Sequence, residues 1–340
     1  MSATKIRSGP TIAPVSAQRR QALAFFAALG STPWPACAQP AEKIRVIGYL
    51  TLSEKPSLRD EIFTQGMREL GWIEGKNIRI EIRRAGNDIK RLAAMAQELV
   101  QLKVDLIVAL STPAVAAARD ATSDIPIVSL SADPVANGFV ASLRRPGGNI
   151  TGLSMMMPVL AGKRLELLRE IKPKIARVAF LAHGGDPAHK NFIAEMESAG
   201  KVLGIKIDAV IVTHADQIDD AFVTMQKLRA EGLAIQPLFI NTLGLGPRIA
   251  TLANAQRLLS VADGDGFAEQ GGLLFYGPDP TAMYRRIAYY TDRVLKGANP
   301  TEFPVEQPTL FLVTVNLKTA KLLGVKMPYS IMVRANKVIE

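Results

Sequence analysis

The sequence has very little cysteine and few aromatic residues. Its 340 residues include one cysteine, Cys37, and aromatic residues make up 6% of the chain. A single thiol excludes an intramolecular disulfide and a cysteine-rich zinc site. No apolar stretch approaches the roughly 20 residues that a membrane-spanning helix requires. We therefore expect the fold to be stabilised by burial of apolar side chains, which with Cys make up 48% of the residues.

Signatures of metal sites, nucleotide sites and enzymes are also missing. The three histidines, His183, His189 and His214, do not have zinc-protease spacing, and no phosphate loop ends in Gly-Lys-Ser/Thr. The run 263–266 starts like a calcium loop, but its twelfth position is Leu274 instead of a bidentate glutamate. We expect no catalytic residue, no metal and no cofactor.

The first 38 residues have the order of an export signal. Arg19 and Arg20 precede the apolar stretch 22–30, and small residues lead to Ala38. We predict a periplasmic protein, exported and cleaved after Ala38. The arginine pair leaves the general and twin-arginine export routes both open, and Cys37 offers an alternative as a lipid-anchor site.

The positive charge does not indicate nucleic acid as a partner. The whole chain has a formal charge of +10, and without residues 1–38 it has 37 basic and 31 acidic residues, a charge of +6. These charges are scattered, with no basic run and no alternation of basic and aromatic residues, so no nucleic-acid surface is expected.

From residue 44 the chain alternates between short β-rich runs and longer segments with helical periodicity. This alternation predicts parallel strands joined by covering helices. In the first series we expect strands at 45–50, 78–83, 105–110, 126–130 and 149–153, with helices near 58–70, 89–102 and 114–121. In the second we expect strands at 177–182, 206–212, 235–241 and 258–262, with helices near 160–171, 190–203, 218–230 and 247–255.

Two series of similar size predict an α/β protein of two similar lobes, each a parallel sheet flanked by helices. Glycine pairs at 147–148 and 271–272 each precede a short apolar strand and then a helix. We interpret these strands as crossings between the lobes, with a third crossing at 310–315, so that three crossings form a hinge. The predicted first lobe comprises 44–153 and 279–300, and the second 154–278 and 310–330.

Ligands of open α/β sheets bind beyond the carboxyl ends of the strands. In the first lobe, hydroxyl and carboxylate residues follow these ends, and several stand near prolines that start helices or turns. Candidate ligand contacts there are Thr51, Ser111, Thr112, Ser131 and Asp133. Capping of a helix or turn is the alternative role for Ser111, Thr112 and Asp133.

The second lobe and the crossings provide the opposing candidates. His183, Asn241 and Asp263 follow predicted strands, Met155 follows the first crossing, and Tyr276 ends the second. Met155 and Tyr276 could instead pack in the core or the hinge, and Asp263 could instead belong to a tight turn.

Several segments resemble the substrate-binding proteins of ABC transporters, in particular those similar to tryptophan- and tyrosine-binding proteins. The matching segments are GMRELGWIEGKN at 66–77, DLIVALSTP at 105–113, IPIVSLSADPV at 125–135, LRRPGGNITG at 143–152, GGLLFYGP at 271–278 and PVEQP at 304–308. The resemblance implies a type I periplasmic-binding-protein fold, a small solute held between the lobes, and delivery to a membrane permease with its ATPase. The chain departs from the family at 241–244 (NTLG), so the solute implied is an amino acid or another small carboxylate.

The expected mechanism is capture of that solute by hinge closure in a monomeric protein. Two alternatives stay open on sequence alone. The same module could present its solute to a membrane receptor as a sensor, or it could be an enzyme built on a related two-lobed scaffold.

Overall fold

The computed structural model describes residues 44–156 and 158–340, and residues 44–340 form one unit of two lobes. The predicted export signal and Cys37 lie outside the described residues. Within these ranges, none of the helices is long and apolar enough to cross a membrane.

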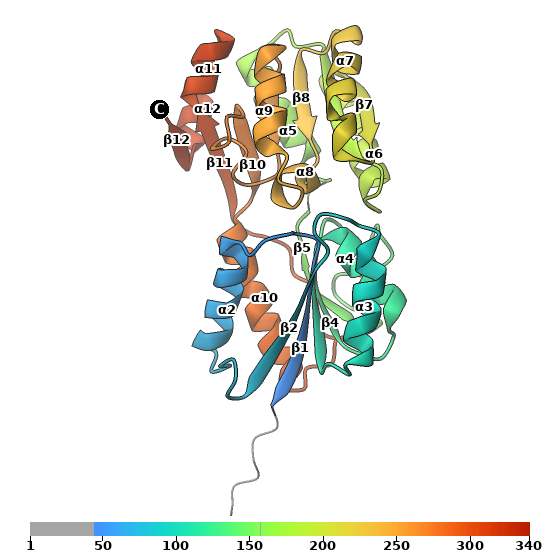
Figure 1. Ribbon diagram of the computed structural model, residues 1–340. Helices are drawn as coiled ribbons and strands as arrows, with labels where there is room; N and C mark the ends of the chain where they lie inside the picture. Colours follow the sequence, from blue (N-terminus) through green and yellow to red (C-terminus); the bar gives the residue numbers. More distant parts are fainter. Residues whose placement is uncertain (1–43, 157) are drawn as a thin grey trace, which may run out of the picture. The chain divides into compact units, whose positions relative to one another are not determined.

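The first lobe is built on a parallel sheet with helices on both faces (Figure 1). Its strand order is β2-β1-β3-β4-β5. The elements are β1 (Arg45–Thr51), α2 (Leu58–Glu69), β2 (Ile78–Arg84), α3 (Arg91–Gln101), β3 (Leu106–Leu110), α4 (Thr112–Ala121), β4 (Ile127–Ser131), β5 (Ile150–Ser154) and, from later in the chain, α10 (Pro280–Leu295).

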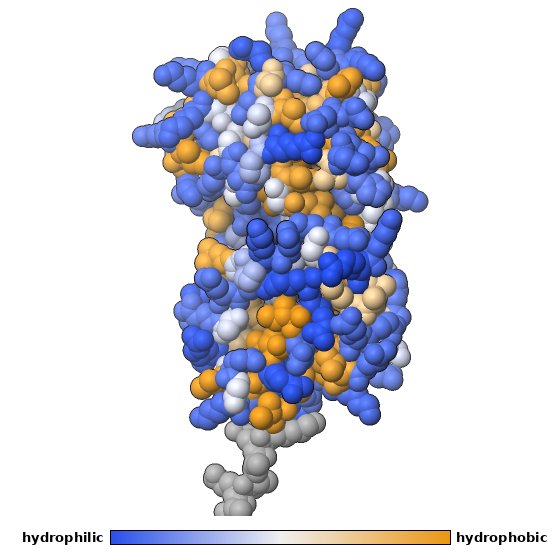
Figure 2. Space-filling view, in the orientation of Figure 1, coloured by the Kyte–Doolittle hydropathy of each residue, from blue (hydrophilic) through white to orange (hydrophobic). Residues whose placement is uncertain are grey.

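Every residue of β3, β4 and β5 is buried, because α2 and α10 cover one face of the sheet and α3 and α4 the other. In contrast, β2 is an edge strand, and Ile82 on it is 46% exposed. Figure 2 shows hydrophobic side chains at the surface of this lobe between α2 and α3.

The second lobe has the same architecture with a longer sheet, in the order β12-β11-β10-β9-β8-β6-β7. Its elements are α5 (Ala161–Ile171), β6 (Arg177–His183), α6 (His189–Leu203), β7 (Lys206–Val212), the 3-10 helix η1 (Ala215–Gln217), α7 (Ile218–Lys227), β8 (Gly232–Ile235), α8 (Pro237–Asn241), α9 (Gly246–Ala255), β9 (Leu259–Ala262), β10 (Leu274–Pro278), β11 (Phe311–Asn316), α11 (Leu317–Leu323), α12 (Tyr329–Arg334) and β12 (Lys337–Ile339).

The prediction of two helix-flanked parallel sheets is confirmed, with one exception and one correction. The exception is the antiparallel pairing of β10 with β11. The correction concerns the strand expected at 235–241, which is wrong beyond Ile235. Pro237 has no N–H for a strand ladder and instead starts the short helix α8.

The hinge brings three parts of the chain side by side. The chain leaves the first sheet through β5 and enters α5, and it returns from β10 into α10. The third part runs along β5, where Ser154 N–H donates to the Glu306 carbonyl at 2.8 Å, and then enters β11. Gly152 in β5 adopts a φ of +129°, which favours glycine. A Cβ atom there would also collide with the Ser129 backbone of β4. The crossings are thus held against one another near the cleft.

Candidate functional site

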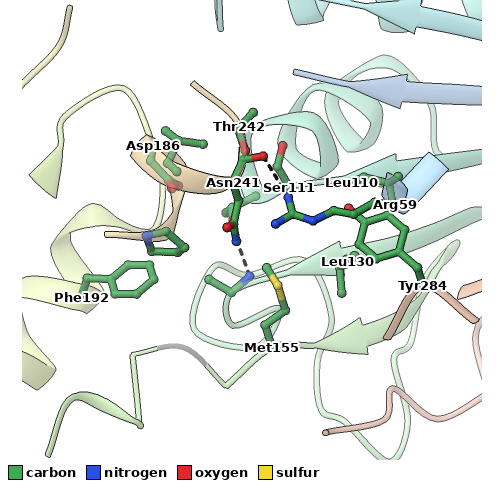
Figure 3. A pocket seen from close by; sticks show the side chains of 14 residues that line it. Arg59, Leu110, Ser111, Leu130, Met155, Asp186, Phe192, Asn241, Thr242 and Tyr284 are labelled. Atoms are coloured by element: carbon green, nitrogen blue, oxygen red, sulfur yellow. Dashed lines mark hydrogen bonds between the residues drawn. The ribbon is translucent and has the colours of Figure 1, made fainter. Parts of the chain in front are cut away.

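A small cavity of about 60 Å³ lies between the lobes at the carboxyl ends of their strands (Figure 3). We call it the inner cavity. The first lobe contributes Arg59, Leu110, Ser111, Thr112, Leu130, Ala132 and Tyr284, the first crossing contributes Met155, and the second lobe contributes Asp186, Phe192, Pro237, Leu238, Asn241 and Thr242. Both lobes are therefore needed to enclose it.

On the first lobe, the start of α4 forms one wall of the inner cavity. Ser111 caps this helix by accepting a hydrogen bond from the Ala114 N–H at 3.4 Å, and Thr112 accepts one from the Ala132 N–H at 3.1 Å. The positive end of the α4 dipole accordingly lies at the cavity, with Thr112 buried. This wall favours a negatively charged group.

On the second lobe, Asp186 is a buried carboxylate at the inner cavity. One oxygen accepts a hydrogen bond from the Ala188 N–H at 2.9 Å, and the other accepts one from the Gln236 amide at 2.8 Å. Burial raises the pKa of Asp186 to about 6. Among the described residues, no lysine or arginine forms an ion pair with it. This wall therefore favours a positively charged group.

Arg59 connects the two lobes directly. From the first turn of α2 it donates to the Asn241 carbonyl at 2.9 Å (Figure 3). It also forms an ion pair with Asp265, and both partners belong to the second lobe. Burial opposes the positive charge, but Asp265 and the neighbouring Tyr284 more than offset this, and the pKa of Arg59 is raised. We call this pair the interlobe latch. It favours the closed arrangement of the lobes.

Substitution of Asp265 with alanine is expected to open the protein. In the closed arrangement the variant would leave Arg59 without its carboxylate partner, whereas in an open arrangement water can solvate the guanidinium. The side chains of Arg59 and Asp265 are 19% and 30% exposed. We therefore expect a moderate effect, a fall of about tenfold in the ratio of closed to open molecules, or about 1.4 kcal/mol.

Small-angle scattering measures this opening as a larger radius of gyration. A matched control is Asp219→Ala, which breaks the ion pair with Arg248 inside the second lobe at 2.5 Å. Identical scattering curves for wild type and the Asp265 variant would contradict the role of the latch.

Asp263, two residues from Asp265, forms a second ion pair away from the cavity. Its carboxylate lies 3.1 Å from Arg164, and the two side chains are 1% and 2% exposed. Burial raises the pKa of Asp263 to about 7, against the opposing effect of Arg164. Arg164 also donates to the Tyr276 carbonyl at 3.3 Å. The ion pair joins α5 to the loop after β9, and the hydrogen bond joins α5 to β10.

A larger cavity of about 650 Å³ also lies between the lobes. We call it the outer cavity. The first lobe contributes Asn87, Asp88, Ile89 and Lys90, and the second contributes His183, Gly184, Gly185, Thr213, His214, Ala215, Leu243 and Leu245. Within residues 44–156 and 158–340, no group of three or more His, Cys, Asp or Glu side chains could hold a metal ion.

The structure distributes the ten predicted contact residues over several places. Ser111, Thr112, Met155 and Asn241 line the inner cavity, and His183 lines the outer cavity. The other five line neither. These are Thr51, which hydrogen-bonds Ser53; Ser131, buried at the end of β4; Asp133, which accepts from the Val135 and Ala136 N–H groups as a turn cap; Asp263; and Tyr276, stacked on Phe311.

The residues of the inner cavity that were not predicted as contacts from the sequence include Arg59, Asp186, Phe192 and Tyr284. Asp186 could have been predicted, because it follows the end of β6 by three residues and polar residues after strand ends are the expected ligand contacts. Arg59 and Tyr284 lie on helices at opposite ends of the lobe's sequence, and no strand end marks them.

Comparison with known proteins places this site in a family. The family model described as ABC transporter substrate binding protein matches residues 47–339. A tyrosine-binding protein of Clostridioides difficile (strain R20291) is 27% identical over 290 residues, 84% of this chain and 83% of the relative. A domain from Streptococcus pneumoniae in complex with L-Trp is 25% identical, with a TM-score of 0.80 over 87% of this chain and 100% of that one.

A third relative was solved in an open form. The ligand-free, open structure of a substrate binding protein with adhesive properties from Clostridium difficile is also 25% identical, and it covers 87% of this chain and 99% of that one. Its TM-score is lower, at 0.63. Rotation of one lobe against the other lowers such a score without changing either fold, and in this chain Arg59 of the first lobe contacts Asn241 and Asp265 of the second. With its type I periplasmic-binding-protein fold, the chain belongs to the family of ABC transporter substrate binding proteins.

Proposed function

We propose that this protein captures an amino acid between its lobes in the periplasm and delivers it to an ABC permease. The observation that carries the proposal is the pair of opposite walls of the inner cavity. The start of α4 on the first lobe suits a carboxylate, and Asp186 on the second lobe suits an ammonium group. An α-amino acid has both groups on one carbon.

The charge balance of the closed site supports an ammonium group at Asp186. Arg59 is paired with Asp265, and Arg164 is paired with Asp263. The carboxylate of Asp186 accepts hydrogen bonds from the Ala188 N–H and the Gln236 amide, and among the described residues no lysine or arginine forms an ion pair with it. A buried carboxylate is costly unless it is paired, and a bound ammonium group would provide the partner.

The relatives support the same class of solute. One is described as tyrosine-binding, and the other was solved with L-Trp bound. In this chain the solute would be held by Ser111 and Thr112 at its carboxylate and by Asp186 at its ammonium group, with Met155 and Asn241 completing the contacts. Thr51, Ser131, Asp133, His183, Asp263 and Tyr276 stay as proposed contacts of lower rank.

Solute contacts with both lobes would add to the latch and shift the population further toward the closed form. The permease would bind that form through surfaces of both lobes and stimulate its ATPase. A monomer suffices for this cycle, and catalysis has no part in it. Export would depend on the segment that ends at Ala38.

A thermal-shift screen over the twenty amino acids tests the proposal. A solute at 100 times its Kd stabilises the folded protein by about 2.7 kcal/mol, so at least one amino acid should raise the melting temperature by several degrees. If no amino acid does so at millimolar concentration, the amino-acid assignment is wrong. Export is tested separately, by fusing residues 1–43 to a periplasmic reporter and replacing Arg19 and Arg20 with lysine to distinguish the routes.

A further inference from the structure

The inner and outer cavities are adjacent parts of one interlobe cleft. The loop after β6 lines the outer cavity at His183–Gly185 and the inner cavity at Asp186. The segment that contains α8 lines the inner cavity at Asn241 and Thr242 and the outer cavity at Leu243 and Leu245. The same two segments therefore line both cavities.

The two cavities differ greatly in capacity. At about 60 Å³, the inner cavity has room for roughly four water-sized groups, which is enough for a carboxylate and an ammonium group but not for a large side chain. The outer cavity, at about 650 Å³, is in the range of pockets that hold whole small molecules. Any bulky part of a solute therefore has to lie in the outer cavity.

The outer cavity combines an apolar part with the exposed residues Asp88 and Lys90. Ile89 from the first lobe and Leu243 and Leu245 from the second provide apolar surface. His183 is buried, and burial together with His214 and His189 lowers its pKa, so its imidazole is neutral at pH 7. The side-chain oxygen of Asn87 is buried with no hydrogen-bond partner among the described residues. An unpaired acceptor of this kind favours a solute that carries a donor.

We propose that the outer cavity is a second subsite, which takes a bulky, mostly apolar group on the side chain of the captured amino acid. The subsite rests on the proposed function for the charged head of the solute in the inner cavity. It extends that function by naming a solute class: α-amino acids whose side chains carry more than a single ring. Small amino acids would leave the outer cavity to water and bind more weakly.

Isothermal titration calorimetry with alanine, tyrosine and O-benzyl-tyrosine tests this subsite, since the three share one head and differ in side-chain length. We expect affinity to increase along the series, by at least tenfold from alanine to O-benzyl-tyrosine. Ala215→Trp would fill part of the outer cavity, and so would Leu245→Trp if the first variant points its ring to solvent. Each variant is expected to lower the affinity for O-benzyl-tyrosine at least tenfold more than the affinity for alanine.

Val202→Trp is the matched control, because Val202 is 84% exposed on α6 and lines neither cavity. The inference is overturned if O-benzyl-tyrosine binds more weakly than tyrosine. It is also overturned if both cavity-filling variants bind O-benzyl-tyrosine with the same affinity as the control variant. Either result, with amino acids still binding, leaves the proposed function in place. Absence of binding by all three compounds would overturn the amino-acid head as well.

Discussion

Asp186→Asn is expected to weaken amino-acid binding by about a hundredfold. The substitution keeps the size of the side chain but removes the negative charge that would pair with the solute's ammonium group. Loss of one partner of a buried, hydrogen-bonded charge pair costs about 2–5 kcal/mol, and a hundredfold lies at the lower end of that range. Calorimetric titration with the tightest amino acid from the thermal-shift screen measures the change.

The same variant is expected to change how stability depends on pH. Because burial raises the pKa of Asp186 from 3.8 to about 6, the folded protein binds this proton more tightly than the unfolded chain does. The carboxylate therefore costs stability as pH rises from about 4 to about 6, and this cost persists at pH 7. Asparagine carries no such proton.

The gain in unfolding free energy from Asp186→Asn should therefore be larger at pH 7 than at pH 4, by about 2 kcal/mol. Urea unfolding at the two pH values measures this difference and cancels the pH-independent effect of losing one hydrogen bond to Gln236. Asp219→Asn is the control, since its carboxylate lies at the surface in an exposed ion pair. Equal effects of Asp186→Asn at both pH values would show that the pKa of Asp186 is not raised in the folded protein.

Arg164→Met is expected to lower the free energy of unfolding by about 3 kcal/mol at pH 7. It would leave Asp263 buried without its cation and would remove a hydrogen bond to the Tyr276 carbonyl, and breaking a buried pair typically costs about 3–5 kcal/mol. Protonation of Asp263, whose pKa is already raised to about 7, keeps the loss at the lower end. Denaturant unfolding measures it.

The double variant Arg164→Met/Asp263→Leu should recover most of this loss, because apolar residues of similar size remove both charges from the interior. Lys163→Met is a neighbouring control, since Lys163 forms a half-exposed pair with Glu166 at 2.9 Å. A double variant that is no more stable than Arg164→Met would show that loss of the ionic contact itself, and not the buried unpaired charge, causes the destabilisation.

The outcome for the strand ends shows how far sequence reasoning reaches. The paired hydroxyl residues after β3 were expected at the cleft, and Ser111 and Thr112 line the inner cavity. At the end of β4, however, Asp133 turns back to cap its own loop, and Ser131 is buried. The rule places residues at the correct edge of the sheet, but the direction of each side chain depends on the neighbouring loops.

The latch illustrates the same limit more strongly. Arg59 and Asp265 are far apart in the sequence, and each belongs to a segment that local rules assign to an ordinary helix start or turn. Their contact exists only because the hinge sets one lobe against the other. A single sequence carries no signal for such a pair.

The sequence by itself determined the two successive βα series, the strands that cross between them, and the resemblance to solute-binding proteins, because periodicity and short motifs are local properties of the chain. Only the tertiary structure decided which charged groups find which partners: Arg59 pairs with Asp265 across the cleft, Arg164 pairs with Asp263 inside the second lobe, and the Asp186 carboxylate accepts from the Ala188 N–H and the Gln236 amide. Interactions between distant residues depend on how two folded lobes face each other, and this geometry is set by packing over the whole chain.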